Sequence, residues 1–168
     1  MIRHHHSVWT EGTDVGLIGG VLVALFFTVR DVFTERLFAT PNALGQIIIL
    51  GRGSPDLTTL VPEAIWGYTA FHFAAFIVFG IAVTQLVHLA TREPVFRYAL
   101  LSVFIVFEVF FLGVTLTISE ETRALFPAWM VVSANTIAAL GMGYYLWKKH
   151  PGIKRAIGRV PLGAARVD

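Results

Sequence analysis

Glu108 is the residue with the clearest potential for chemistry. It lies between Phe107 and Val109, near the middle of a long uncharged stretch. A charged side chain at the centre of a membrane helix costs about 2.5–3.5 kcal/mol, so Glu108 requires a hydrogen-bond partner or a proton. Asn135, at a similar depth in the last apolar stretch, is the expected partner. The alternative is a carboxyl that carries protons through the membrane.

His72 is a second ionisable residue inside an apolar stretch. Asp31, at the end of the first apolar stretch, can reach a similar depth, and an Asp31–His72 contact would satisfy both groups. The alternative is that His72 is an axial ligand of a haem or a (bacterio)chlorophyll. A bis-histidine haem needs a second histidine on a facing helix, and the other apolar stretches contain none. We therefore predict no cofactor and no other metal ligand.

Motifs of the common enzyme classes are absent from the sequence. There is no cysteine, which excludes disulfides, thiolate metal sites and cysteine nucleophiles. The chain has no P-loop and no HExxH motif. Ser102, Ser119 and Ser133 lack the base and the elbow sequence of a serine nucleophile. We expect no enzymatic activity and no nucleic-acid partner.

Four long apolar segments position these side chains. Apolar residues make up 55% of the 168-residue chain and charged residues only 14%, against about 25% in soluble domains. A bilayer core about 30 Å thick is crossed by about 20 helical residues. We predict an all-α integral membrane bundle of four transmembrane helices, with spans at about 15–31, 64–90, 95–119 and 126–147. Residues 1–150 would form a single transmembrane domain, and residues 151–168 a basic cytoplasmic tail.

The long connection between the first two spans contains a short apolar segment. Thr40 has the residue type of a helix N-cap, and Pro41 suits the first helical position. Gly51 and Gly53 then end the apolar run, which is too short to cross a membrane. We predict a helix over about 41–51 that lies in the outer membrane interface.

The distribution of Lys and Arg predicts the orientation, because cytoplasmic segments carry more of them. Of the 13 basic residues, four are on the side of the long connection: Arg30, Arg36, Arg52 and Arg123. The others are on the side of the two ends: Arg3, Arg92, Arg97, Lys148, Lys149, Lys154, Arg155, Arg159 and Arg166. Both termini are therefore expected in the cytoplasm, where the basic tail can contact anionic lipid.

Small residues at four-residue spacing predict where the helices pack closely, because little hydrophobic force drives helix association in lipid. The first span has one such stripe, and the last span has two. They consist of Gly16, Gly20 and Ala24; Ala134 and Ala138; and Ala139 and Gly143.

Several of these segments together resemble a group of small bacterial four-helix integral membrane proteins. The similarity covers about residues 12–151 and is carried by Gly16-Leu-Ile-Gly-Gly, Thr40-Pro41, Gly67-Tyr-Thr-Ala-Phe-His, Phe107-Glu-Val-Phe-Phe-Leu-Gly and Gly141-Met-Gly-Tyr-Tyr-Leu-Trp. It includes Asp31, His72, Glu108 and Asn135. The resemblance implies the four-span fold and the bacterial inner membrane, and it carries over no function or ligand.

The sequence thus favours a non-catalytic accessory subunit that packs against a larger bacterial membrane complex, respiratory or photosynthetic. Its partners would be membrane lipids and the other subunits of that complex. One alternative is a small transporter or proton-coupled carrier that uses Glu108. Another is a haem or pigment binder that uses His72.

Overall fold

The computed structural model describes residues 7–34, 36–92, 102–103, 105–106, 108–109, 113 and 120–150. All regular secondary structure in these residues is helical, which confirms the all-α prediction. The helices are α1 (Val8–Phe33), α2 (Ala39–Ile48), α3 (Pro62–Arg92), α5 (Glu120–Leu125) and α6 (Ala128–Lys149). Most of the predicted span at 95–119 lies outside the described residues, and those described between 102 and 113 are helical.

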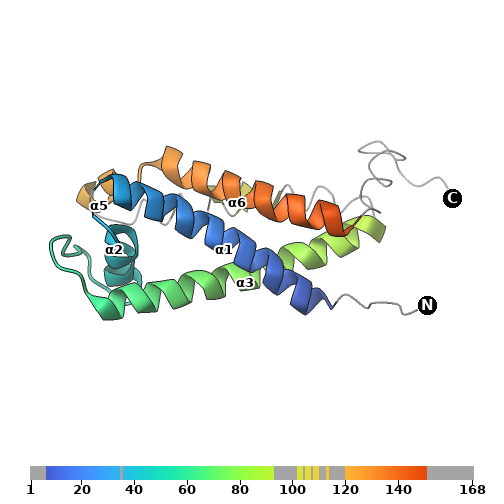
Figure 1. Ribbon diagram of the computed structural model, residues 1–168, viewed down its shortest axis with the longest axis horizontal. Helices are drawn as coiled ribbons and strands as arrows, with labels where there is room; N and C mark the ends of the chain where they lie inside the picture. The colour runs from blue at the N-terminus through green and yellow to red at the C-terminus, as the bar shows by residue number, and fades with distance from the viewer. Residues whose placement is uncertain are drawn as a thin grey trace.

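The three long helices run lengthwise beside one another (Figure 1). α1 contacts both α3 and α6, and α2 packs on α3. α1 begins at the end of the molecule where α3 and α6 finish, whereas α2 and α5 lie at the opposite end. We call the first the tail end and the second the loop end.

Among the described residues, two helices are long and apolar enough to cross a membrane, namely Val8–Phe33 and Pro62–Ala90. The prediction for the first was too short, because α1 begins at Val8 rather than at about 15. Its first turns are polar, so apolar length alone does not reveal them. The last predicted span corresponds to α6, which begins directly after Pro127 and has two lysines in its final turn.

α2 lies close to its predicted position but begins differently. The helix starts at Ala39, after Phe38 in the left-handed conformation (φ 68°). Thr40 is therefore not the N-cap, and both its amide and its hydroxyl bond to Asp31 instead. The helix ends at Ile48, before Gly51, whose φ of +67° only glycine adopts readily.

Glycines bring α1 and α3 into backbone contact. A Cβ on Gly16 would lie 2.3 Å from the Phe76 carbonyl oxygen, and one on Gly80 would lie 2.3 Å from the Gly16 nitrogen. A Cβ on Gly20 would meet the Phe73 ring at 3.1 Å. The first-span stripe is therefore a real close-packing face at Gly16 and Gly20, as expected for helices that associate in lipid.

The stripes predicted on the last span have different surroundings. Ala134 and Ala138 are buried in a cluster with Val23 and Phe76. A Cβ on Gly143, in contrast, would meet none of the described atoms within 4 Å, so its packing role stays a prediction. Of the other predicted packing residues, Ala24 and Ala139 are half-buried.

Candidate functional site

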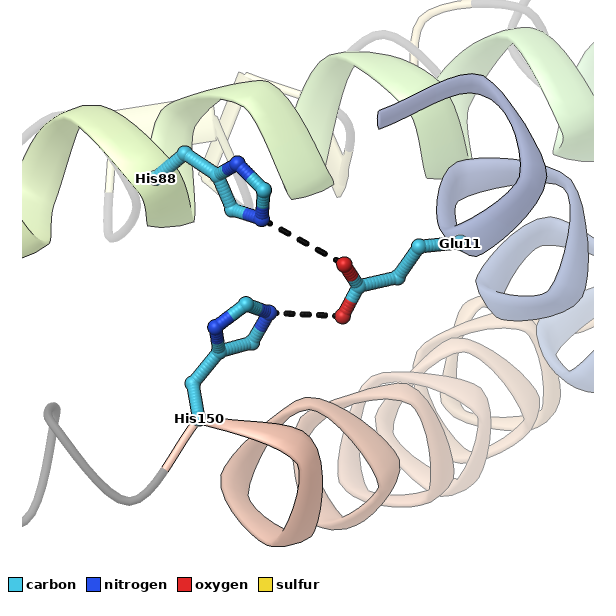
Figure 2. A group of neighbouring side chains, drawn as sticks. All are labelled: Glu11, His88 and His150. Carbon is cyan, nitrogen blue, oxygen red and sulfur yellow. Dashed lines mark hydrogen bonds and ion pairs between the residues drawn. The ribbon is translucent and has the colours of Figure 1, made fainter. Parts of the chain in front are cut away.

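A carboxylate and two histidines meet at the tail end. Glu11, in the first turn of α1, is only 2% exposed, and its side chain lies between the ends of α3 and α6 (Figure 2). One carboxylate oxygen lies 3.3 Å from Nε2 of His88, and the other lies 2.6 Å from Nε2 of His150. We call these three residues the tail-end cluster.

Each member of the cluster is held by a different helix. Glu11 follows the start of α1 by less than one turn, and its amide bonds to the Ser7 carbonyl. His88 precedes the end of α3 by about one turn. His150 directly follows α6, where its amide bonds to the Leu146 carbonyl. The rings of the two histidines touch edge to face, with centroids 4.8 Å apart.

A second contact beside the cluster also joins α1 to α6. The Tyr145 hydroxyl donates a hydrogen bond of 2.8 Å to Asp14, which lies one turn after Glu11. The ammonium of Lys149 lies 5.2 Å from the Tyr145 ring centre. A hydrogen bond with the Tyr145 hydroxyl raises the pKa of Lys149 above its ordinary value.

The tail-end cluster was not predicted from the sequence, although a signal was present. Glu11, His88 and His150 each lie near the end of a long helix. Because α1 runs antiparallel to α3 and α6, the start of α1 and the ends of α3 and α6 lie at the same end of the molecule (Figure 1). Considering the helix topology together with the positions of the polar residues would have predicted that the three side chains meet.

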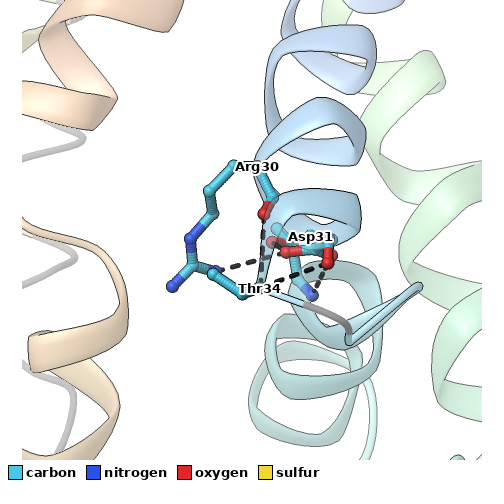
Figure 3. Close-up of polar contacts among 4 residues, drawn as sticks. Arg30, Asp31 and Thr34 are labelled. Atoms are coloured by element: carbon cyan, nitrogen blue, oxygen red, sulfur yellow. Dashed lines mark hydrogen bonds and ion pairs between the residues drawn. The ribbon is translucent and has the colours of Figure 1, made fainter.

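Asp31 is the centre of a polar network at the loop end (Figure 3). It is 1% exposed, and its two oxygens accept bonds of 2.7 Å from the Thr40 amide and the Thr40 hydroxyl. Nη1 of Arg30 lies 3.2 Å from the same carboxylate. The network ties the end of α1 to the start of α2.

The predicted Asp31–His72 contact is wrong. His72 Nε2 lies 3.0 Å from the Gly20 carbonyl oxygen, and Gly20 precedes Asp31 by about 16 Å along α1. His72 also contacts the rings of Phe73 and Phe76, with centroids 5.4 and 4.8 Å away. The cavity beside it measures about 190 Å³, below the roughly 300–1,000 Å³ of ligand pockets. This geometry lends no support to a haem or pigment at His72.

The structure brings Glu108 and Asn135 together. Asn135 Nδ2 donates to one Glu108 oxygen at 3.4 Å, which is a long hydrogen bond. The other oxygen of Glu108 is buried and has no hydrogen-bond partner among the described residues. Among the described residues, Asn135 thus satisfies one of the two Glu108 oxygens.

Two buried amide side chains fix the connection that follows α2. The Asn42 side chain accepts a bond from the Val61 amide and donates one to the Thr59 carbonyl, both at 2.9 Å. Gln46 binds both the amide and the carbonyl of Asp56, at 2.9 and 2.7 Å. The connection is thus held on α2 by specific bonds, which the sequence analysis did not anticipate.

Asp56 and two arginines are among the charged residues at this end. Hydrogen bonds from the Thr58 hydroxyl and amide lower the pKa of Asp56 from 3.8 to about 2. A cavity of about 400 Å³ nearby is lined by Arg30, Arg36 and Phe126, among others. The Arg30 guanidinium lies 5.8 Å from the centre of the Phe126 ring. The cavity could accept an anionic group.

No protein-family model, no curated protein and no solved structure matches this chain. The resemblance to small bacterial four-helix membrane proteins therefore stays a prediction. What the sites can do must be argued from their own geometry.

Proposed function

We propose that the chain is a four-span integral protein of the bacterial inner membrane, with both ends in the cytoplasm, and that it serves as a non-catalytic accessory subunit. In this arrangement the tail end lies inside and the loop end outside. The partner would be a larger membrane complex, of the respiratory or photosynthetic class that we expect from the sequence.

The outward faces of the long helices support a membrane location. Leu25 is 54% exposed, Val78 68% and Leu140 69%. Further large apolar side chains are exposed on the same helices: Leu17, Val21, Val29, Phe71, Val132 and Ile137. Soluble proteins rarely expose apolar patches larger than a few hundred Å², so lipid or protein must cover these faces.

The observation that carries the subunit role is the ordered apolar surface of the loop end. Phe33 is 83% exposed and Trp66 74%, and they are accompanied by Leu37, Phe38, Ile48, Ile49, Leu50 and Leu60. We call these residues the cap surface. Fixing the backbone in one conformation costs about 1–2 kcal/mol of conformational entropy per residue. A connection that only joined two helices would not require this order. Asn42 and Gln46 fix the connection that carries Leu60. This part of the cap surface is therefore suited to pack against another subunit, and the cavity at Arg30 and Arg36 suits an acidic partner residue.

Site-specific photo-crosslinking in native membranes tests this role. A photoreactive amino acid at Phe33 should crosslink to one defined protein, whereas the same group at Leu140, on the mid-helix surface, should crosslink mainly to lipid. Phe33→Asp should abolish co-purification of that protein in mild detergent while the chain still folds. A lone monodisperse monomer, or equal crosslinking from both positions, would refute the role.

A second candidate function is favoured by the Glu108 oxygen that has no hydrogen-bond partner in the part of the chain that the structure describes. A protonatable carboxyl at this depth could carry protons in a small coupled transporter. Glu108→Gln keeps the shape and the bond to Asn135 but removes the titrating proton, so proton-coupled flux into proteoliposomes should disappear. An unchanged flux would end this alternative.

A further inference from the structure

We propose that the tail-end cluster of Glu11, His88 and His150 binds a divalent transition-metal ion, with Zn²⁺ as the best fit. One carboxylate oxygen and one nitrogen of each histidine all lie within 4.8 Å of one another. Both imidazoles direct Nε2 at the same carboxylate (Figure 2). This inference does not depend on the subunit role proposed above.

The distances suit a small ion with little rearrangement. Zinc bonds to nitrogen and oxygen are about 2.0–2.2 Å long, so donors around a tetrahedral zinc lie about 3.3 Å apart. The separation of His88 Nε2 from the nearer Glu11 oxygen is already 3.3 Å. The separation of His150 Nε2 from the other Glu11 oxygen is 2.6 Å. Because one carboxylate oxygen and the two imidazole nitrogens lie within 4.8 Å of one another, they must approach by at most about 1.5 Å to reach the spacing of a tetrahedral site. Because His150 follows the last residue of α6, its side chain can move without displacing a helix.

The donor types select the ion. Two imidazoles and one carboxylate suit Zn²⁺ and its neighbours in the first transition series, whereas Ca²⁺ and Mg²⁺ prefer oxygen donors. Binding replaces the protons on the two Nε2 atoms, so each imidazole moves to the Nδ1–H tautomer or loses its charge. Three protein ligands leave a fourth position for water or another donor, as in zinc sites that bind a substrate.

The competing explanation is a purely structural ion pair. Glu11 is almost fully buried, whereas the side chains of His88 and His150 are 29% and 19% exposed. Two protonated histidines, or two neutral N–H donors, would also satisfy the carboxylate. Glu11→Gln distinguishes the two explanations. The amide oxygen of Gln still accepts hydrogen bonds, so a structural contact with the histidines would be retained. The same oxygen is a poor zinc ligand, so zinc binding would weaken.

The test is zinc binding to the purified full chain in detergent. The chain should carry no polyhistidine tag, and His4, His5 and His6 should be replaced by alanine, because three clustered histidines bind metal themselves. Titration calorimetry with ZnCl₂ should give one ion per chain, with a micromolar or lower Kd. The visible bands of bound Co²⁺ should indicate tetrahedral or five-coordinate geometry.

The variants make the proposal specific. Glu11→Gln, His88→Ala and His150→Ala should each weaken zinc binding by about 100-fold, a size typical of losing one ligand or its support. Asp14→Asn, which changes a carboxylate one turn from Glu11, is the matched control and should bind like the parent. His150→Ala alters no helix interior, so it remains informative if the other two variants fail to fold.

Two results would overturn the proposal. One is a parent chain without His4–His6 that binds no zinc at 100 µM, a concentration chosen as about 100 times a micromolar Kd. The other is a His150→Ala variant that binds zinc as tightly as the parent. Either result would leave the cluster as an ion pair that joins α1, α3 and the end of α6.

Discussion

Replacing Gly16 with alanine tests the close packing of α1 on α3. The added Cβ would lie 2.3 Å from the Phe76 carbonyl oxygen and 2.5 Å from Cα of Ile77. Both are backbone atoms, so no change of side-chain rotamer can relieve the overlap. Ordinary contacts of a Cβ begin at 3.4 Å, and the two helices must therefore separate locally by about 1 Å.

The cost of this separation can be worked out from the packing. A gap of about 0.5–1 Å forfeits a quarter to a half of the dispersion energy of each contact across the crossing. Overpacked cores typically lose about 1–3 kcal/mol. Because the obstacle here is backbone, we expect a loss near the upper limit, about 3 kcal/mol. Gly143→Ala is the matched control: its Cβ would meet none of the described atoms within 4 Å, so helix propensity should stabilise it by up to about 1 kcal/mol.

Reversible unfolding in mixed micelles of mild detergent and dodecyl sulfate, followed by the fluorescence of the four tryptophans, measures both free energies. The same chemical change should thus have opposite signs at the two positions. Adding Gly80→Ala to Gly16→Ala should cost less than the sum of the single changes, because both substitutions push apart the same crossing. A Gly16→Ala variant as stable as the parent, or an equal loss at Gly143, would refute the reasoning.

Three further predictions concern the loop end. Asp31→Ala leaves the amide and hydroxyl of Thr40 without their acceptor and should lower the free energy of unfolding by about 2–4 kcal/mol in the same titration; a loss below about 1 kcal/mol would contradict the network. Asn42→Ala removes the bonds that hold the connection after α2, so limited proteolysis there should become about tenfold faster or more, and unchanged cleavage would count against the clamp. Thr58→Ala should raise the pKa of Asp56 from about 2 towards 3.8, as read by carboxyl-carbon NMR. Because folding lowers this pKa, the ionised Asp56 contributes stability above pH 3.8 that is lost as the pH falls through about 2. The variant keeps the bond from the residue 58 amide and should therefore lose only part of this dependence, and a pKa that stays near 2 would exclude the Thr58 hydroxyl as a cause.

The helices themselves were largely predictable, because apolar length is a local property of the sequence. α3 and α6 begin within a few residues of the expected positions. The start of α1 was not predictable in this way, since Glu11 in its first turn is buried by contacts with histidines far away in the sequence. The N-cap prediction at Thr40 was wrong for a similar reason. The cap-like residue pattern is local, whereas the donors of Thr40 bond to Asp31 on another helix.

The polar sites were predictable only in part. Counting residues from the connection between the last two predicted spans placed Asn135 at the depth of Glu108, and the structure brings the two side chains together. The same counting failed for Asp31 and His72, because α1 continues to Phe33 and carries Asp31 well past His72. The tail-end cluster required knowledge of which helix ends coincide, and no single residue in it has an unusual local sequence.

The bond between Glu11 and His150 also sets an order of events during synthesis. The two residues are 139 positions apart, whereas Glu11 and His88 are 77 apart. The extra chain length adds only about 0.5 kcal/mol to the entropy of loop closure. The extra chain length has a larger effect on timing. A ribosome that makes about 5–20 residues per second needs roughly 3–12 s to proceed from His88 to His150. During that interval the carboxylate of Glu11 can contact only the imidazole of His88. It gains the contact with His150 once α6 has docked, so the complete cluster forms only after synthesis has passed α6.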